Sequence, residues 1–260
     1  MTADPEEADR FQRTGILVGQ DGLERLRNAH VAIFGLGGVG GYALEAIART
    51  GIGNILIADF DTVEPSNINR QLLALDATVG RLKTEVAHER IRQINPTARV
   101  VVWSQFIEAE KVEDLLHHFE HECAFPVQFA IDAIDAVASK ASLLYALHNR
   151  GAVTVSCMGA GSRLNPTGYQ VADIAATRHC PLARAVRQRL RRLGIDSGIR
   201  CVYSEENLNR VAVSDETGAT DRGDGDRRKK NAQGTISYVP GLVGLMAAGV
   251  IIEDIVRGER

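Results

Sequence analysis

A glycine-rich turn is the feature that most constrains what this chain can fold into. It reads Gly-Leu-Gly-Gly-Val-Gly over residues 35–40. The apolar run 31–34 directly before it predicts a strand that is buried on both faces. Residues 42–50 after it are typical of a helix, and a second apolar strand then ends in Asp59. Strand, glycine turn, helix and strand in this order predict the start of a doubly wound parallel sheet.

The alternation of strand and helix patterns continues along the chain. Further strands are predicted at 99–103, 127–131 and 152–157, and further helices at 81–94, 138–149 and 181–193. This order predicts an α/β fold, with a Rossmann-like doubly wound, mainly parallel sheet, helices on both faces and a C-terminal elaboration. We expect one domain over 1–260, with a main part at about 10–160 and a C-terminal elaboration at about 161–260. The polar segment 213–234 is predicted to be a flexible loop.

Composition and cysteine spacing narrow the class of protein. Of 260 residues, 45% are hydrophobic and 24% are charged, as in ordinary globular proteins. The net charge of −3 excludes binding of nucleic acid through an overall positive charge, but not through a local basic face. The four cysteines lie 34, 23 and 21 residues apart, so no pair has zinc-clip spacing and zinc is not expected. The polar first ten residues carry no secretory signal, which predicts a cytoplasmic protein with reduced thiols.

The longest apolar stretch lies near the C-terminus, at 236–252. It is interrupted by Pro240 and by small residues, and it is shorter than the ~20 residues that a membrane-spanning helix needs. We therefore predict a buried or interface helix and no transmembrane segment. Peripheral membrane contact is the alternative interpretation.

The glycine turn and the carboxylate after the second strand predict a nucleotide site. Gly35 would allow a tight turn, Gly37 would let the backbone approach a phosphate, and Gly40 would allow close packing of helix on strand. Asp59 lies 19 residues after Gly40, where a carboxylate can accept hydrogen bonds from both ribose hydroxyls. Up to this point NAD and ATP both fit.

The polar segment after Asp59 discriminates between the two nucleotides. It contributes Asp61, Asn67, Arg70, Gln71 and Lys83. The two cations would stabilise the negative charge that moves onto pyrophosphate, and the two amides can orient phosphate oxygens. An NAD enzyme has no use for such a set, so ATP is favoured. Taken singly, Arg70 could be a surface cation and Lys83 an ordinary residue of a first helical turn.

Two aspartates, Asp132 and Asp135, follow the strand that ends at 131. Both are expected near the end of that strand, where ligands of open sheets bind, so Asp132 is assigned to the nucleotide site. Asp135 could hold a Mg²⁺ ion that bridges phosphates. Either residue could instead cap the following helix.

The chain resembles the ThiF/MoeB/HesA superfamily, which comprises the ubiquitin-activating enzymes and the bacterial sulfur-carrier activators and shares an adenylating fold. The resemblance rests on five motifs in this order: G-x-G-G-x-G, D-x-D-x-V, S-N-x-x-R-Q, V-G-x-x-K and D-x-x-D. The match covers most of residues 10–160. It implies a single adenylating domain over 1–260, with a nucleotide-binding part at about 10–160 and a substrate and dimer elaboration at about 161–260. The resemblance implies that Gly38 approaches the nucleotide through its backbone, that Asp59 holds the ribose and that Asp135 serves Mg²⁺. It implies ATP and Mg²⁺ as cofactors and is compatible with a monovalent cation. It also implies a homodimer in which Arg13 reaches into the neighbouring subunit's site, although Arg13 could simply be an exposed arginine.

Six further segments narrow the resemblance to one branch. The tRNA threonylcarbamoyladenosine dehydratases are similar to this chain at 10–11, 50–53, 157–167, 170–174, 200–205 and 234–240. The paired C-x-x-C motifs usual in sulfur-carrier activators are missing. The resemblance implies ATP-dependent cyclisation of the modified adenosine in tRNA through an acyl-adenylate. A cysteine desulfurase or another sulfur-relay protein is a further partner that it allows. The alternatives are an adenylyltransferase that activates the C-terminus of a ubiquitin-like sulfur carrier, and a scaffold without catalysis.

The predicted helix 181–193 is strongly basic. Five of its residues from 184 to 192 are arginines, and none is acidic. Such a stripe could follow the phosphates of tRNA, although a merely solvated helix face is the alternative. The candidate tRNA-binding residues are Arg184, Arg187, Arg191 and Arg192.

Overall fold

The computed structural model describes residues 10–207 and 234–258. The predicted flexible loop 213–234, except for its last residue, lies outside the described residues.

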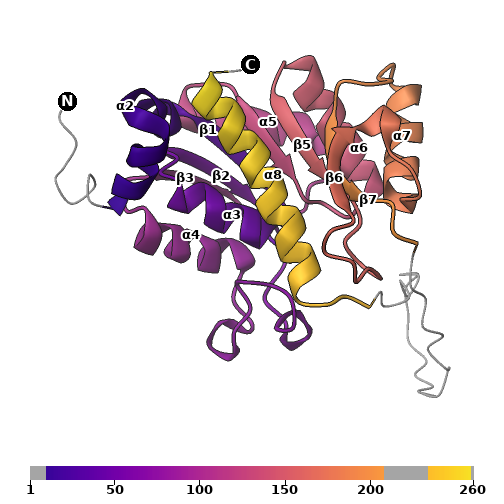
Figure 1. The fold of residues 1–260 in the computed structure, drawn as a ribbon, viewed down its shortest axis with the longest axis horizontal. Coiled ribbons are helices and arrows are strands. Elements are labelled where there is room, and N and C mark those ends of the chain that lie inside the picture. Colours follow the sequence, from indigo (N-terminus) through magenta and orange to yellow (C-terminus); the bar gives the residue numbers. More distant parts are fainter. Residues whose placement is uncertain (1–9, 208–233, 259–260) are drawn as a thin grey trace.

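The described residues form a seven-stranded sheet in the order β3-β2-β1-β4-β5-β7-β6 (Figure 1). The edge strand β6 is antiparallel to β7, and every other neighbouring pair is parallel. The strands are β1 (His30–Phe34), β2 (Asn54–Ala58), β3 (Arg99–Trp103), β4 (Phe129–Asp132), β5 (Val153–Cys157), β6 (Tyr169–Asp173) and β7 (Arg200–Ser204). The predicted Rossmann-like, mainly parallel α/β fold is thereby confirmed.

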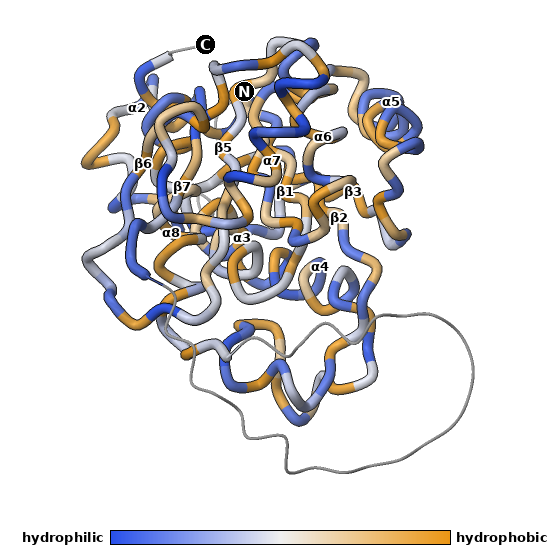
Figure 2. The backbone as a smooth tube through the Cα atoms, turned by 90° about the vertical axis from the view of Figure 1, so that its right-hand side faces the viewer, coloured by the Kyte–Doolittle hydropathy of each residue, from blue (hydrophilic) through white to orange (hydrophobic). Residues whose placement is uncertain are grey.

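Helices cover both faces of the sheet (Figure 1). The α-helices are α2 (Gln12–Asn28), α3 (Gly40–Arg49), α4 (Lys83–Ile94), α5 (Val112–Cys123), α6 (Val137–Asn149), α7 (Pro181–Arg192) and α8 (Tyr238–Arg257). Apolar residues of α3, α4 and α8 form one buried cluster with the sheet, and those of α5 and α6 form a second on the opposite face. A third cluster joins α7 to β7. In the hydropathy view, the segment between β2 and α4 projects from the body of the fold and alternates hydrophobic and hydrophilic residues (Figure 2).

The predicted elements are present, with small differences at their ends. The helix expected from residue 81 begins at Lys83, because Leu82 has an extended conformation and bridges to Thr62. The strand expected from residue 127 begins at Phe129. Helices α2 and α5 and the edge strand β6 were not predicted from the sequence.

The apolar C-terminal segment forms α8, which packs along α3 and also contacts β5 and α2. A side chain at Gly244 would come within 2.1 Å of the Val39 carbonyl oxygen, so glycine is needed where α8 crosses the start of α3. Among the described helices, only α8 is long and apolar enough to span a membrane, yet most of its apolar window is buried in the protein. The prediction of a buried helix is confirmed.

Candidate nucleotide site

The candidate site lies where the strand order reverses. From β1 the chain proceeds outward through β2 and β3, and it then returns to place β4 on the other side of β1. In open α/β sheets, ligands bind outside the carboxyl ends of the strands at this switch point. The loops after β1, β2 and β4 therefore define the site.

The glycine turn after β1 has the backbone geometry that its sequence predicts. Gly35 has a φ of +88°, in the left-handed region that favours glycine. A side chain at Gly40 would come within 1.7 Å of the Gly35 carbonyl oxygen, so α3 can start this close to the turn only with glycine there. A Cβ at Gly37, in contrast, would have only the Gln71 side-chain nitrogen within reach, at 3.9 Å. The backbone at Gly37 is thus open for a ligand to approach.

Asp59 lies directly after β2 and is tied to the glycine turn. Its Oδ2 accepts a hydrogen bond of 2.6 Å from the Leu36 N–H, and its Oδ1 accepts one of 2.8 Å from the Asp61 N–H. Burial raises the pKa of this carboxyl above its ordinary value, while nearby Lys83 and the two N–H donors act in the opposite direction. The carboxylate is therefore held in position beside the turn, as an acceptor for ribose hydroxyls requires.

Lys83 lies at the start of α4 and is only 4% exposed. Its Nζ lies 2.8 Å from Oδ2 of Asp61, which is half-exposed. Its backbone N–H also donates to the Asp61 carbonyl oxygen, at 3.0 Å. These contacts hold a buried ammonium group next to the loop that carries Asp59.

The segment between β2 and α4 brings two more predicted residues to the turn. A Cβ at Gly38 would lie 3.3 Å from the carbonyl oxygen of Arg70 and 3.5 Å from its Cγ. The Arg70 guanidinium donates to the Ser66 carbonyl oxygen and to the Asn69 side chain. Gln71 is buried, and its Oε1 has no hydrogen-bond partner among the described residues. An unpaired buried polar atom beside an open glycine turn favours a polar ligand there.

Asn67, which is predicted to orient phosphate oxygens, takes part in a local turn. It is buried, and its Oδ1 accepts a hydrogen bond of 3.2 Å from the Glu64 N–H. This contact caps the short 3₁₀ turn Pro65–Asn67. Its contact with phosphate stays a prediction.

The two aspartates after β4 are in contrasting environments. Asp132 is fully buried, and its Oδ2 lies 2.8 Å from Nζ of the equally buried Lys140. Asp135 is exposed, in the loop between β4 and α6. Of the two, Asp135 is therefore the carboxylate that lies on the surface, where a ligand can reach it, and Asp132 contributes to the structure beneath it.

Sequence reasoning missed an aromatic pair beside Asp59. The rings of Phe60 and Phe106 lie 4.8 Å apart at 87°, in an edge-to-face arrangement. Both side chains are about half exposed. Exposed aromatic surface next to a ribose acceptor suits a planar base. Phe60 could have been noticed, because it directly follows the predicted ribose carboxylate.

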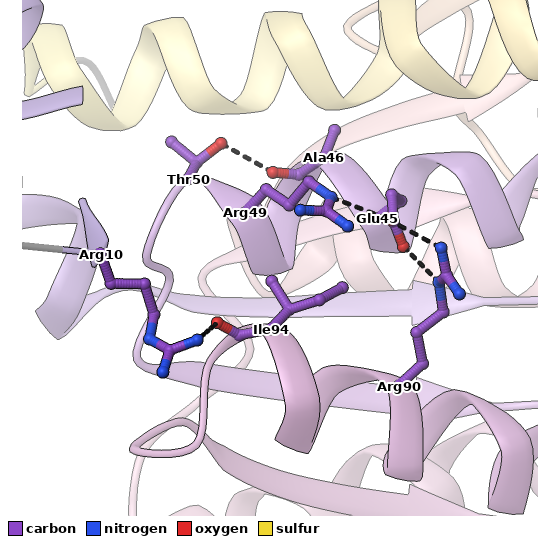
Figure 3. Close-up of polar contacts among 7 residues, drawn as sticks. All are labelled: Arg10, Glu45, Ala46, Arg49, Thr50, Arg90 and Ile94. Carbon is purple, nitrogen blue, oxygen red and sulfur yellow. Dashed lines mark hydrogen bonds and ion pairs between the residues drawn. The ribbon is translucent and has the colours of Figure 1, made fainter. Parts of the chain in front are cut away.

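Arg13 lies far from this site within its own chain. The ring of its neighbour Phe11 packs on Gly51, which precedes β2, and Arg10 donates to the Ile94 carbonyl oxygen at the end of α4 (Figure 3). Both contacts are at the amino-terminal edge of the sheet, opposite the glycine turn. Arg13 is exposed on α2.

The arginines of α7 do not form a uniform stripe. Arg187 is half-buried, and its Nη1 donates to the Thr177 carbonyl oxygen at 2.9 Å, so it fixes the segment before the helix. Arg184, Arg191 and Arg192 are exposed. Arg184 also lines a hollow of ≈ 450 Å³ at the start of α7. Of the four candidate tRNA-binding residues, these three stay on the exposed basic surface, and Arg189, which was not among the candidates, is exposed on the same helix as well.

The four cysteines are free and buried. Burial raises the pKa of the Cys157 thiol to about 12 and raises the pKa values of the Cys123 and Cys201 thiols as well. Buried thiols with raised pKa values are poor nucleophiles. The interpretation of Cys201 as a core residue is confirmed by its complete burial in β7.

Comparison with known proteins agrees with this geometry. The model of the ThiF family matches residues 11–258. The chain belongs to the ThiF family. The family resemblance predicted from the motifs is thus confirmed.

Two curated proteins to which the chain is similar are named tRNA threonylcarbamoyladenosine dehydratase. The protein from Bacillus subtilis (strain 168) is 35% identical over 250 residues, which are 95% of either chain. The protein from Escherichia coli (strain K12) is 40% identical over 210 residues, 76% of this chain and 74% of that one. The crystal structure of the E. coli tRNA N6-threonylcarbamoyladenosine dehydratase in complex with ATP superposes with a TM-score of 0.84 at 33% identity, covering 99% of this chain and 98% of that chain.

Proposed function

We propose that this ThiF-family chain catalyses the ATP-dependent dehydration, by cyclisation, of N6-threonylcarbamoyladenosine in tRNA. One observation carries the adenylating part: the ribose-type carboxylate of Asp59, the buried ammonium of Lys83 and the open backbone at Gly37 meet at the switch point of the sheet. Similarity to dehydratases over nearly the whole chain supports the substrate.

The first step activates a carboxylate. The threonyl carboxylate of the modified adenosine attacks the α-phosphate of ATP, so that a carboxylate oxygen–phosphorus bond forms and the bond to pyrophosphate breaks. Arg70 and Lys83 stabilise the negative charge that develops on the departing pyrophosphate. The glycine turn and Asp59 hold the nucleotide in line for the attack.

The second step closes the ring. A nucleophile of the same threonylcarbamoyl group loses its proton and attacks the activated carbonyl carbon, and AMP leaves with the former carboxylate oxygen. Because this attack is intramolecular, no enzyme nucleophile is required. The buried cysteines fit such a mechanism.

The residues at the site fit a Mg²⁺ ion carried by the nucleotide. Within the described residues, no three His, Cys, Asp or Glu side chains gather as a metal site. Nucleotide-bound Mg²⁺ typically takes one or two protein carboxylates, and its other ligands are phosphate oxygens and water. Exposed Asp135 would hold this ion, which supplies charge neutralisation at the phosphates when bound.

We propose further that the enzyme is a cytoplasmic homodimer. Because Arg13 lies at the opposite edge of its own sheet, it can reach a glycine turn only in a second copy. Beside it, Ile16 and Leu17 of α2 are 80% and 85% exposed, and exposed apolar side chains of this size suit an interface. A cysteine desulfurase is the other partner that the resemblance allows. It would have to bind without transferring sulfur to the cysteines, because these are buried.

The alternative function is adenylation of a ubiquitin-like sulfur carrier. It would use the same nucleotide site, but the carrier's flexible C-terminus would take the place of the modified nucleoside. The measurement that separates the two is mass spectrometry of the products, a carrier–AMP adduct against cyclised nucleoside in tRNA.

Replacement of Asp135 by Ala tests the adenylation site. We expect it to abolish ATP–pyrophosphate exchange driven by modified tRNA, because the carboxylate that would hold the metal at the phosphates is removed. Exchange at the wild-type rate in Asp135→Ala would remove the metal assignment. The same assay with unmodified tRNA gives the background.

The basic surface of α7 is tested by changing the three exposed candidate arginines together, Arg184, Arg191 and Arg192, to Gln. We expect the KM for tRNA to rise and its dependence on salt to weaken by about one unit of log–log slope for each tRNA phosphate that an arginine no longer neutralises. ATP affinity should not change. Arg189→Gln on the same helix is the single-site comparison, and an unchanged KM for tRNA in the triple variant would contradict the proposal.

A further inference from the structure

A fully buried ion pair lies directly beneath the candidate metal-binding loop. Asp132, the last residue of β4, and Lys140, in α6, both have no exposed surface. Their charged atoms, Oδ2 and Nζ, are 2.8 Å apart. Neither residue contacts solvent, so neither can touch a nucleotide directly.

Every polar atom of the pair is used. The ammonium group also donates to the carbonyl oxygens of Cys157, at 2.9 Å, and of Ile134, at 3.0 Å, and more weakly to that of Asp132, at 3.4 Å, so each of its three donors has an acceptor. Asp132 Oδ2 also accepts a hydrogen bond of 2.7 Å from the Ser156 hydroxyl, and Oδ1 accepts one of 3.1 Å from the Ile134 N–H. Lys140 thereby ties α6 to the end of β5 and to the loop after β4.

Stability alone is a weak reason for such a pair. Desolvation of two ions offsets most of their attraction, and well-packed apolar residues in the same place are often as stable. A fully satisfied buried network instead fixes one geometry. The geometry fixed here is that of loop 133–136, which carries Asp135.

The same loop also supports the glycine turn. The Ala133 N–H donates to the Phe34 carbonyl oxygen, at 2.8 Å, and a Cβ at Gly35 would lie 2.9 Å from the Ala133 carbonyl oxygen. A displacement of the loop would therefore move both Asp135 and the wall of the turn. By holding this loop, Lys140 fixes the position of Asp135, on the metal side of the site, relative to the glycine turn, on the phosphate side.

We propose that Asp132 and Lys140 are positioning residues that hold loop 133–136, and through it Asp135, in place for the metal–nucleotide complex. The inference rests on the proposed function and deepens it. Neither residue is catalytic, because neither reaches the reacting atoms. Their effect is exerted through the two hydrogen bonds at Ile134.

The test removes both charges together, in the double variant Asp132→Asn, Lys140→Met. The single variant Lys140→Met leaves a lone buried carboxylate and is expected to fold poorly, whereas the neutral pair keeps the volume and the acceptor for the Ile134 N–H. ATP affinity is measured by calorimetry without tRNA, with and without Mg²⁺. Amide hydrogen exchange at Ile134 is measured on the same proteins.

In the neutral pair we expect the gain in ATP affinity from Mg²⁺ to fall about 10- to 100-fold, the range typical of residues that support a metal ligand. Affinity without Mg²⁺ should change little, kcat should fall more than KM for ATP rises, and exchange at Ile134 should be faster. Asp135→Asn should also lose the Mg²⁺ effect, but with unchanged exchange at Ile134.

The control is an ion pair elsewhere in the fold, which joins Glu45 of α3 to Arg90 of α4 (Figure 3). Its neutral variant, Glu45→Gln, Arg90→Met, should keep the Mg²⁺ effect. An equal loss of the Mg²⁺ effect in that control would overturn the inference. So would a wild-type Mg²⁺ effect in the Asp132–Lys140 variant while Asp135→Asn loses it. Either result would leave the proposed function standing. A wild-type Mg²⁺ effect in Asp135→Asn would overturn both the metal assignment and this inference.

Discussion

Replacement of Lys83 by Met is expected to lower turnover about 100- to 1000-fold, the effect of losing one preorganised charge from an active site. Lys83 is nearly fully buried, and Asp61 holds its Nζ at the carboxyl edge of the sheet. A charge that is already in place needs no reorganisation when pyrophosphate departs. The measurement is single-turnover release of AMP from ATP with modified tRNA.

The stability of this variant should be close to that of the wild type. Asp61 is half-exposed, so water can solvate its carboxylate when the ammonium is gone, and the cost is about 1 kcal/mol or less. Arg81→Met is the control, because Arg81 is a neighbouring cation whose partner, Glu89, lies on the surface. Turnover of Lys83→Met within tenfold of wild type would show that Lys83 does not stabilise the departing charge.

Most of the sheet could be predicted because its central strands are continuous apolar runs between turns. The helix α5 could also have been predicted: Val112, Leu115, Leu116, Phe119 and Cys123 recur at helical spacing, and all are buried. Helix α2 could not, since Ile16 and Leu17 are exposed and Gly19 interrupts the helix with a φ of +74°. Among the apolar side chains of α2 only Leu26 is fully buried, so the helix has no continuous buried stripe to recognise.

The candidate site, like the fold, could be predicted only in part. The glycine turn, Asp59 and Lys83 are local motifs, and they meet because adjacent parallel strands end at the same edge. Spacing alone could not separate Asp132 from Asp135, because only the three-dimensional position of Lys140 places one inside and leaves the other outside. In the sequence Lys140 is an ordinary lysine of a predicted helix. Its role is visible only in the fold, where it contacts the ends of β4 and β5.

Two inactive variants are expected to restore activity when they share a dimer. Arg13→Ala lacks the arginine that each subunit would provide to its partner, and Lys83→Met lacks a residue of its own site. In a mixed dimer, the subunit with Arg13→Ala keeps its Lys83 and receives Arg13 from the other subunit, so one site is complete. One complete site in each mixed dimer predicts about half of wild-type activity.

The experiment uses two differently tagged copies, expressed together and purified through both tags in sequence, so that only mixed dimers are assayed. The matched control pairs Lys83→Met with Asp59→Asn. Both changes affect a subunit's own site, and no mixed dimer then has a complete one. Recovery in the first pair but not in the second would place Arg13 in the site of the neighbouring subunit, as proposed from the position of α2 at the opposite edge of its own sheet. A purified mixed dimer without recovery would exclude that role for Arg13, and full activity of Arg13→Ala alone would exclude any role for it in catalysis.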